Sequence, residues 1–385
     1  MLSATGITAA LAILAISATV FDSDPVAPPA AITDADHVVA ADGGDFQTIQ
    51  AAVDAAAAGD IIRILPGTYD GSVLVDRDLT ITGDAEDPDS VVVRIPDGGP
   101  TVDFKGVDIG YGFLFDDVTA EISHLTISGP GAGVSALVAD GGDLTAHHLV
   151  EDLDPYVEEP YGFLYVGGDM TGDIYANSTK ALVLFDEQAK PTFRENDVAN
   201  VIRIRALAFP SVEDNAVGGI WLHGTGAPLV ESNTIDFANN GVGDGGSGTC
   251  GIEVSPGFKQ ATITRNRVRN APTGVCVDSA TAVNLTQNDI EADVVGIDVY
   301  RADVSVRHNS IHGDGDGIVV RGRNPSWIES NSVDVTGQGL LILSPASPWV
   351  SGNDFCGGEN DIVLGEGVDV EVGASNGCNE TPTDR

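Results

Sequence analysis

The chain has 385 residues, 42% of them hydrophobic, and its 58 acidic residues outnumber 18 basic ones to give a net charge of −40. This charge excludes nucleic acid as a partner, because the chain would be repelled by a phosphate backbone. Such a surface keeps a protein soluble but destabilises it through self-repulsion, an arrangement associated with halophiles. We therefore expect a halophilic protein that works in a salty medium.

Residues 7–21 form an apolar stretch (ITAALAILAISATVF) of the length of a signal-peptide core and too short for a typical membrane span. We predict a signal peptide over residues 1–21 and a flexible, Pro-rich linker over residues 22–37. No Lys or Arg precedes the apolar stretch, so an uncleaved anchor is the alternative and the one expected membrane contact. The expected location is secreted, cell-surface or periplasmic.

The segment after the linker predicts a helix followed by strands. Phe46, Ile49, Ala52, Val53 and Ala56 fall on one helical face, which predicts a helix over residues 46–58. A strand over residues 61–65, a Pro-Gly turn and two more strands are expected next.

An asparagine then recurs through the chain. The positions are Asn177, Asn196, Asn215, Asn233, Asn266, Asn288, Asn309, Asn331 and Asn353. The last five are spaced by 22, 21, 22 and 22 residues, and each interval holds two short alternating apolar runs separated by Gly, Asn and Asp. Such a repeat predicts a solenoid of strands, with the Asn amides tying down turns. We expect His147 and Leu125 at the same place in earlier coils, and a protruding loop at residues 241–248.

The segment 46–83 resembles the N-terminal cap of right-handed parallel β-helix proteins of the pectin lyase-like superfamily. Similar caps occur in pectin methylesterases and NosD-type periplasmic proteins. The resemblance implies an all-β, right-handed, single-stranded parallel β-helix of about 12 coils over residues 38–380, capped by the helix. The catalytic motifs of pectin methylesterases, pectate lyases and polygalacturonases are missing here, so no catalytic residue is carried over.

The repeat also predicts which side chains of one sheet face inward. Two columns are expected in the core: Ile220, Ile252, Val275, Ile297 and Ile318, and Leu222, Val254, Val277, Val299 and Val320. Two alternating columns are expected to face outward: Arg203, Trp221, Glu253, Cys276, Asp298, Val319 and Leu341, and Arg205, His223, Ser255, Asp278, Tyr300, Arg321 and Leu343.

Aromatic rings beside carboxylates and arginines suit a sugar ring. We therefore expect an exported protein that binds or cleaves an extracellular polysaccharide along this face. The substrate-binding candidates are Trp221, His223, Tyr300, Arg203, Arg205 and Arg321. The acid/base candidates are Glu253, Asp278 and Asp298, for a glycoside hydrolase or a polysaccharide lyase. The alternative is a non-catalytic cell-surface or adhesion protein whose acids are merely solvated.

His124, His147 and His148 lie on adjacent predicted coils. Two His and a carboxylate can bind a transition metal, and a periplasmic metal-handling accessory of NosD type is a second alternative. Neighbouring strand residues such as His147 and His148 point opposite ways, however, so a turn role is favoured and no metal ligand is assigned. No cofactor is identified; Ca²⁺ at residues 314–316 or around Asp244 stays open.

Four cysteines in an exported chain suggest two disulfides. Cys356 and Cys378 follow Asn353 and Asn376 at nearly equal offsets, which predicts a bond between successive coils. Cys250 and Cys276 are about one coil apart with different offsets, and whether they are bonded is left open.

Overall fold

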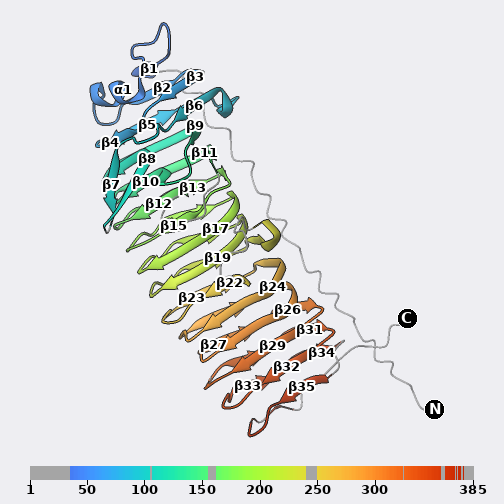
Figure 1. Cartoon of the computed structure of the whole chain (residues 1–385). Helices are drawn as coiled ribbons and strands as arrows, with labels where there is room; N and C mark the ends of the chain where they lie inside the picture. Colours follow the sequence, from blue (N-terminus) through green and yellow to red (C-terminus); the bar gives the residue numbers. More distant parts are fainter. Residues whose placement is uncertain are drawn as a thin grey trace, which may run out of the picture. The chain divides into compact units, whose positions relative to one another are not determined.

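The computed structural model describes residues 35–104, 106–154, 162–239, 249–323, 325–356, 360–368, 370, 372, 373 and 376. Strands of the unit that begins at residue 35 wind into a parallel β-solenoid of about 14 turns (Figure 1). The predicted fold class is confirmed, and the expected coil number is close. The predicted signal peptide lies outside the described residues, and β1 (His37–Val39) begins at the end of the predicted linker.

The capping helix α1 (Ile49–Ala55) is shorter than predicted. Thr48 is its N-cap, because its hydroxyl accepts a hydrogen bond from the backbone N–H of Ala51 at 3.3 Å. Ile49, Ala52 and Val53 are buried, which confirms the apolar face. Phe46 lies before the helix and forms an isolated bridge with Val39 instead.

Strands of successive coils pair in three stacks. Stack 1 contains β1, β2 (Ile61–Ile64), β5 (Leu79–Thr82), β9 (Thr119–Gly129), β11 (Asp143–Leu153), β13 (Thr171–Tyr175), β16 (Thr192–Arg194), β18 (Ser211–Glu213), β20 (Leu229–Glu231), β23 (Ala261–Thr264), β25 (Val283–Thr286), β27 (Val304–Arg307), β30 (Trp327–Glu329) and β33 (Trp349–Ser351). The second halves of β9 and β11 pass into stack 2.

Stack 2 continues with β3 (Gly67–Asp70), β6 (Val91–Arg94), β14 (Ser178–Thr179), β17 (Asp197–Ala206), β19 (Ala216–Gly224), β21 (Thr234–Asp236), β24 (Arg267–Asp278), β26 (Asp289–Tyr300), β28 (Ser310–Gly313), β31 (Ser332–Val335) and β34 (Asp354–Cys356). The second halves of β17, β19, β24 and β26 pass into stack 3.

Stack 3 also contains β4 (Val73–Val75), β8 (Val107–Asp116), β10 (Val134–Asp140), β12 (Gly162–Gly167), β15 (Val183–Phe185), β22 (Cys250–Val254), β29 (Asp316–Arg321), β32 (Gln338–Ile342) and β35 (Asn360–Leu364). The remaining strand, β7 (Thr101–Phe104), pairs antiparallel with β8. Two short 3₁₀ helices, η1 (Pro88–Ser90) and η2 (Phe237–Asn239), complete the described elements.

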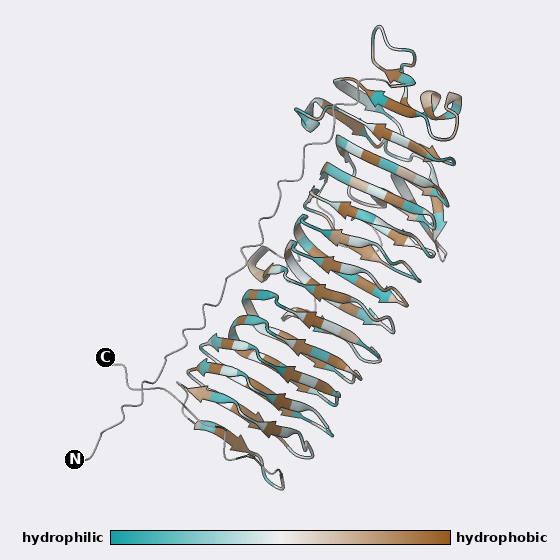
Figure 2. Cartoon of the chain, turned by 180° about the vertical axis from the view of Figure 1, so that it is seen from behind, coloured by the Kyte–Doolittle hydropathy of each residue, from teal (hydrophilic) through white to brown (hydrophobic). Residues whose placement is uncertain are grey.

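The core runs through the middle of the coils. Every residue of the two columns predicted to point inward is buried. Hydrophobic and hydrophilic positions alternate along the strands, as the side-chain period of two requires (Figure 2). In several coils a glycine stands at the start of the stack 3 segment, because the neighbouring coil leaves no room for a side chain there. A Cβ on Gly296, for example, would lie 2.3 Å from Cγ2 of Ile311.

The Asn residues form one continuous hydrogen-bonded ladder at the turn between stack 1 and stack 2. The side-chain Nδ2 of Asn288 donates to Asn309 Oδ1 at 2.9 Å, and its backbone N–H donates to the same oxygen at 3.0 Å. The same pair of bonds repeats from Asn177 to Asn376, including the 33-residue step between Asn233 and Asn266. The predicted structural role is therefore confirmed. The loop predicted at residues 241–248 lies outside the described part of the chain.

Above Asn177 the ladder position is occupied by Leu149, whose backbone N–H donates to Asn177 Oδ1 at 2.9 Å. Leu149 pairs with Leu125 in register, so Leu125 is where the repeat predicted it. The prediction for His147 is wrong, because this residue lies two positions earlier and pairs with Ser123 and Tyr175.

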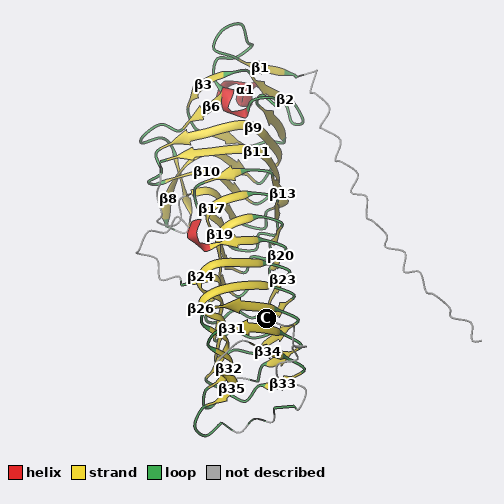
Figure 3. Cartoon of the chain, turned by 90° about the vertical axis from the view of Figure 1, so that its right-hand side faces the viewer, coloured by secondary structure: helices red, strands yellow, loops and turns green. Residues whose placement is uncertain are grey.

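The residue before each ladder position turns the chain with a left-handed backbone conformation. Gln287 and His308 have φ of 57° and 55°. His124 and His148 occupy the same place on two adjacent coils nearer the N-terminus, with φ of 58° and 53°. This conformation is uncommon outside glycine. It lets the chain leave stack 1 and enter stack 2 within a few residues, and the turns of successive coils line up along the edge (Figure 3).

One disulfide is described. Cys250 on β22 is bonded to Cys276 on the next coil, with Cα atoms 5.9 Å apart, which answers the question that the sequence left open. Cys378 lies outside the described residues, so its bond with Cys356 stays a prediction. Within the described chain no helix is long and apolar enough to cross a membrane.

Candidate functional site

The outer face of stack 3 carries both columns predicted from the repeat. Arg203 pairs with Trp221, Trp221 with Glu253, Glu253 with Cys276, and Cys276 with Asp298. In the second column Asp278 pairs with Tyr300, and Tyr300 with Arg321. The sequence therefore placed these side chains in their correct order along the face.

Trp221 does not offer an open ring to a ligand. Its side chain is only 6% exposed and packs with Leu182 and Val201, while the guanidinium of Arg203 covers the ring at 4.6 Å from its centroid. The prediction that Trp221 offers an exposed ring to a sugar is therefore wrong. Tryptophan on an outward position is buried here because neighbouring long side chains of the same face cover it.

The other candidates near Trp221 form local contacts of their own. Arg205 lies 3.9 Å from the buried carboxylate of Asp186. Ser255 joins His223 to Glu253, with its hydroxyl 3.2 Å from His223 Nδ1 and 3.0 Å from Glu253 Oε1. The structure therefore separates these residues, together with Arg203, from the hollow described next.

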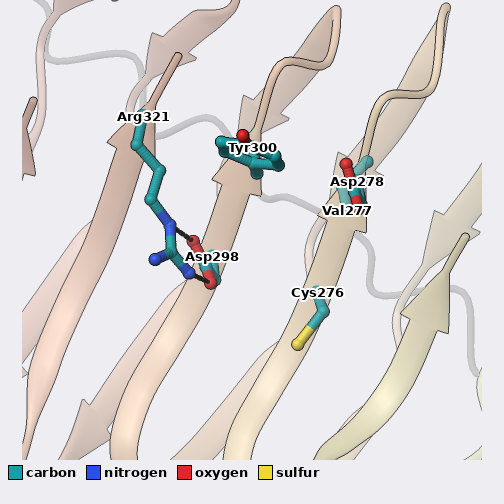
Figure 4. A pocket seen from close by; sticks show the side chains of 6 residues that line it. All are labelled: Cys276, Val277, Asp278, Asp298, Tyr300 and Arg321. Atoms are coloured by element: carbon teal, nitrogen blue, oxygen red, sulfur yellow. Dashed lines mark hydrogen bonds and ion pairs between the residues drawn. The ribbon is translucent and has the colours of Figure 1, made fainter. Parts of the chain in front are cut away.

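Asp278, Asp298, Tyr300 and Arg321 do come together. With Cys276 and Val277 they line a hollow of about 240 Å³ on the outer face of β24, β26 and β29 (Figure 4). The ring of Tyr300 lies between Arg321 and Asp278, and the disulfide-bonded Cys276 lies on the strand of Asp278, in register with Asp298 (Figure 4). Glu253 pairs in register with Cys276, which in turn pairs with Asp298. Glu253 therefore lies two coils away from Asp298.

A second hollow, of about 550 Å³, adjoins the first and shares Tyr300 and Arg321 with it. Its other lining residues are Arg301, Gly322, Arg323, Leu343, Ser344 and Pro345. Gly322 has φ of +74°, and a Cβ there would lie 2.6 Å from Cγ of Arg301, so glycine gives the arginine its space. We call the two hollows together the arginine groove.

Charge is distributed unevenly across the arginine groove. Arg321 donates two hydrogen bonds to the carboxylate of Asp298, and this pairing raises the pKa of Arg321 further above its usual range. Arg301 stacks on Tyr300 at 4.7 Å from the ring centroid. Arg301 and Arg323 have no carboxylate partner among the described residues. The groove thus presents two unneutralised cations beside an aromatic ring.

Sequence reasoning missed Arg301 and Arg323, although a signal for them exists. The two arginines are 22 residues apart, which is one period of the repeat, and each lies one or two residues beyond a member of the second outward column. The columns were followed only along strands, whereas these arginines lie just past the strand ends at the rim.

The three histidines also come together, at the turn between stack 1 and stack 2. The expectation that His147 and His148 point opposite ways is wrong, because the left-handed conformation of His148 breaks the alternation of the strand. His147 Nδ1 lies 2.9 Å from His148 Nδ1, and the rings of His124 and His148 stack 4.8 Å apart. His147 also stacks on Tyr175, with ring centroids 4.8 Å apart.

Burial and neighbouring rings lower the pKa of two of these histidines, His124 and His148. Burial, followed by the influence of His148 and His147, lowers the pKa of His124 to about 4. Burial and His147 also lower the pKa of His148. Glu121 accepts a hydrogen bond from His147 Nε2 at 3.0 Å, which lowers the pKa of that carboxyl group.

Of the aspartates considered as Ca²⁺ ligands, Asp314 and Asp316 are described, and both form hydrogen bonds at a turn. Asp316 accepts a hydrogen bond from the backbone N–H of Gln338 at 2.8 Å, and the carbonyl of Asp314 accepts one from Thr336. His312 in the same segment lies near Asp289 and Glu291. The cluster around Asp244 lies outside the described residues.

Known proteins match this chain in fold. Residues 250–380 match the family model of the right-handed beta helix region. A search of the curated proteins finds no match. Among solved structures, the A-module of the Azotobacter vinelandii mannuronan C-5 epimerase AlgE6 is 13% identical with a TM-score of 0.45, over 87% of this chain and 95% of that one.

Two further solved structures match with lower TM-scores. Tailspike protein 3 of bacteriophage CBA120 is 12% identical with a TM-score of 0.43, over 86% of this chain and 58% of that one. The rice weevil pectin methyl esterase is 14% identical with a TM-score of 0.33, over 66% and 77% of the two chains. The parallel coils show a β-solenoid fold, and residues 250–380 match a family model of the right-handed β-helix.

Proposed function

We propose that this chain is exported and binds an acidic polysaccharide, one that carries uronate carboxylates, in the arginine groove. The observation that carries the proposal is the grouping of Arg301, Arg321 and Arg323 around Tyr300 in a chain with only 18 basic residues. The Cys250–Cys276 disulfide supports export, because disulfides persist mainly in oxidising compartments.

Electrostatics favours a local anion site here. At a net charge of −40 most of the surface repels a polyanion, but this repulsion is screened beyond about 10 Å at moderate salt. Guanidinium groups match carboxylates in planar, charge-assisted pairs. Arg301 and Arg323 are exposed and have no carboxylate partner within the described structure, so their charge is available to a ligand. A polysaccharide with one carboxylate per sugar can meet more than one of these arginines.

Tyr300 supplies the aromatic surface that was expected at Trp221. Its ring is half-buried between Arg321 and Asp278 and lines both hollows. Arg301 lies over this ring at 4.7 Å from its centroid, so a sugar would place its apolar face on the ring face away from Arg301. Its hydroxyls would then lie at the ring edge, where Asp278 can accept hydrogen bonds. The groove therefore combines a stacking surface, an acceptor and cationic groups within three successive coils.

If the bound polysaccharide is cleaved, Asp278 and Asp298 are the candidates for the acid and the base. These acids lie on diagonal positions of neighbouring coils, about 7–8 Å apart at Cβ, which is within the carboxylate spacing of inverting glycosidases. Asp298 is already paired with Arg321, and Asp278 accepts a hydrogen bond from Ser279 Oγ at 2.7 Å. Asp278 is the better acid/base candidate, since it is not neutralised by an arginine.

Binding assays on the full chain with matched acidic and neutral polysaccharides test the proposal. We expect binding of uronate-rich chains only, and a loss of about tenfold or more in affinity for Arg323→Ala and for Tyr300→Ala, since a charge-assisted contact contributes about 1.5–3 kcal/mol. Arg267→Ala is the control, because this arginine lies on the same strand β24 but in stack 2.

Product analysis of the same mixtures separates binding from cleavage. New reducing ends without unsaturated ends, lost in Asp278→Asn with binding retained, indicate a hydrolase. New reducing ends accompanied by unsaturated non-reducing ends indicate a lyase. If no acidic polysaccharide binds, or if Arg323→Ala and Arg267→Ala behave alike, the alternative of a non-catalytic surface protein replaces the proposal.

A further inference from the structure

The turn that carries His124, His147 and His148 brings one ring nitrogen of each residue to within 4.8 Å of the other two. This arrangement depends on two left-handed residues, His124 and His148, which lie at equivalent turns of adjacent coils and stack their rings. His147 then adds its ring at nearly a right angle to both, at interplanar angles of 89° and 84°. Three rings thus surround one point at the edge of the solenoid.

His124 also has an unsatisfied polar atom. Its side chain is only 7% exposed, and its Nδ1 is buried without a hydrogen-bond partner among the described residues. A buried nitrogen without a partner costs free energy, because it has lost its water. A bound cation is one way to satisfy it.

Glu121 prepares His147 as a ligand. Its carboxylate accepts the hydrogen bond from Nε2–H of His147, which leaves Nδ1 of the same ring with its lone pair toward His148. Histidines that bind metals commonly donate their second N–H to a carboxylate in this way, which fixes the tautomer and raises the basicity of the ligating nitrogen. Tyr175 stacks on the His147 ring and restricts its rotation.

We propose that His124, His147 and His148 bind one divalent late transition metal ion, with Glu121 holding His147 from behind. Imidazole nitrogens suit Zn²⁺, Cu²⁺, Ni²⁺ and Co²⁺, whereas Ca²⁺ and Mg²⁺ prefer oxygen ligands. Tetrahedral coordination at about 2.0–2.1 Å places nitrogens roughly 3.3 Å apart. The separation of 2.9 Å between His147 and His148 and the limit of 4.8 Å for the group bracket this value. His148 is exposed and provides the path of entry.

Calorimetric titration of the full chain, freed of metal by a chelator, tests this site with Zn²⁺ and with Co²⁺. We expect one ion per chain, retained in a large excess of Mg²⁺ that occupies weak carboxylate sites. Co²⁺ should give an absorption spectrum of nitrogen coordination. Glu121→Gln should keep the stoichiometry and weaken affinity by about 10- to 100-fold.

His148→Ala is the decisive variant, because this side chain is exposed and its removal leaves the core intact. We expect it to lose the stoichiometric ion. His308→Ala is the matched control, since His308 has the same left-handed turn position on a coil without the other two histidines, and its affinity should equal that of the parent chain. Failure of both ions to bind in excess Mg²⁺, or equal affinity in His148→Ala and His308→Ala, would overturn the proposal.

Discussion

Four hydrogen bonds meet at the side chain of Asn288. Its Oδ1 accepts from the backbone N–H and the Nδ2 of Asn266, and its Nδ2 donates to the carbonyl of Ile263 and to Asn309 Oδ1. All of these groups are buried, so none of them can turn to water instead. An Asn at this position satisfies the turn in a way that no apolar residue of similar size can.

Asn288→Ala should therefore be strongly destabilising. It leaves several buried donors and acceptors without partners, each at a cost of about 1–3 kcal/mol, so we expect the free energy of unfolding to fall by about 3 kcal/mol or more. Urea unfolding followed by circular dichroism measures the change. Asn284→Ala is the control, because Asn284 is exposed on the strand β25 just before the turn, and a change of less than about 0.5 kcal/mol is expected there. Equal effects of the two substitutions would contradict the ladder's role.

At the scale of the strand, the bond between Cys250 and Cys276 joins β22 to β24 on the face that bears the arginine groove. The cross-link encloses a sequence separation of 26 residues. In the chain-entropy description, a loop of this length stabilises the fold by roughly 3 kcal/mol.

We therefore expect the double variant Cys250→Ala, Cys276→Ala to unfold at a clearly lower temperature than the parent chain. Thermal unfolding measures this, and mass mapping of non-reduced peptides shows the bond in the parent. The same variant should also bind acidic polysaccharide less well, because Cys276 lines the groove. An unchanged unfolding temperature would show that the bond does not hold the two coils.

The repeat predicted the strands and their inward and outward columns because one buried amide per coil fixes the register. It failed at three points with physical causes. The repeat does not show which outward side chains are covered by their neighbours, so Trp221 was expected to be exposed. It assumed strand alternation through a left-handed turn, so the His147 and His148 rings were placed apart. It stopped at the strand ends, so Arg301 and Arg323 at the rim of the groove were missed.

At the scale of the whole chain, net charge sets the conditions for stability. A charge of −40 destabilises the folded state through self-repulsion, and salt shortens the screening length from about 10 Å at 0.1 M to about 3 Å at 1 M. We expect the unfolding temperature to rise steadily over this range of NaCl. Sucrose at matched osmolality is the control, since it stabilises without screening charge. An unfolding temperature that is constant or falls with NaCl would contradict the expected halophilic character.

The asparagine ladder also has a mechanical consequence. Each coil is linked to the next by the same pair of amide bonds, so a force applied along the axis passes through these bonds in series. The end coil has a neighbour on one side only and gives way first. Between Asn266 and Asn376 successive ladder positions are 21 to 23 residues apart. Each of these coils that peels away releases roughly 75 Å of extended chain, so this part of the solenoid extends under tension in nearly equal steps rather than by a single rupture.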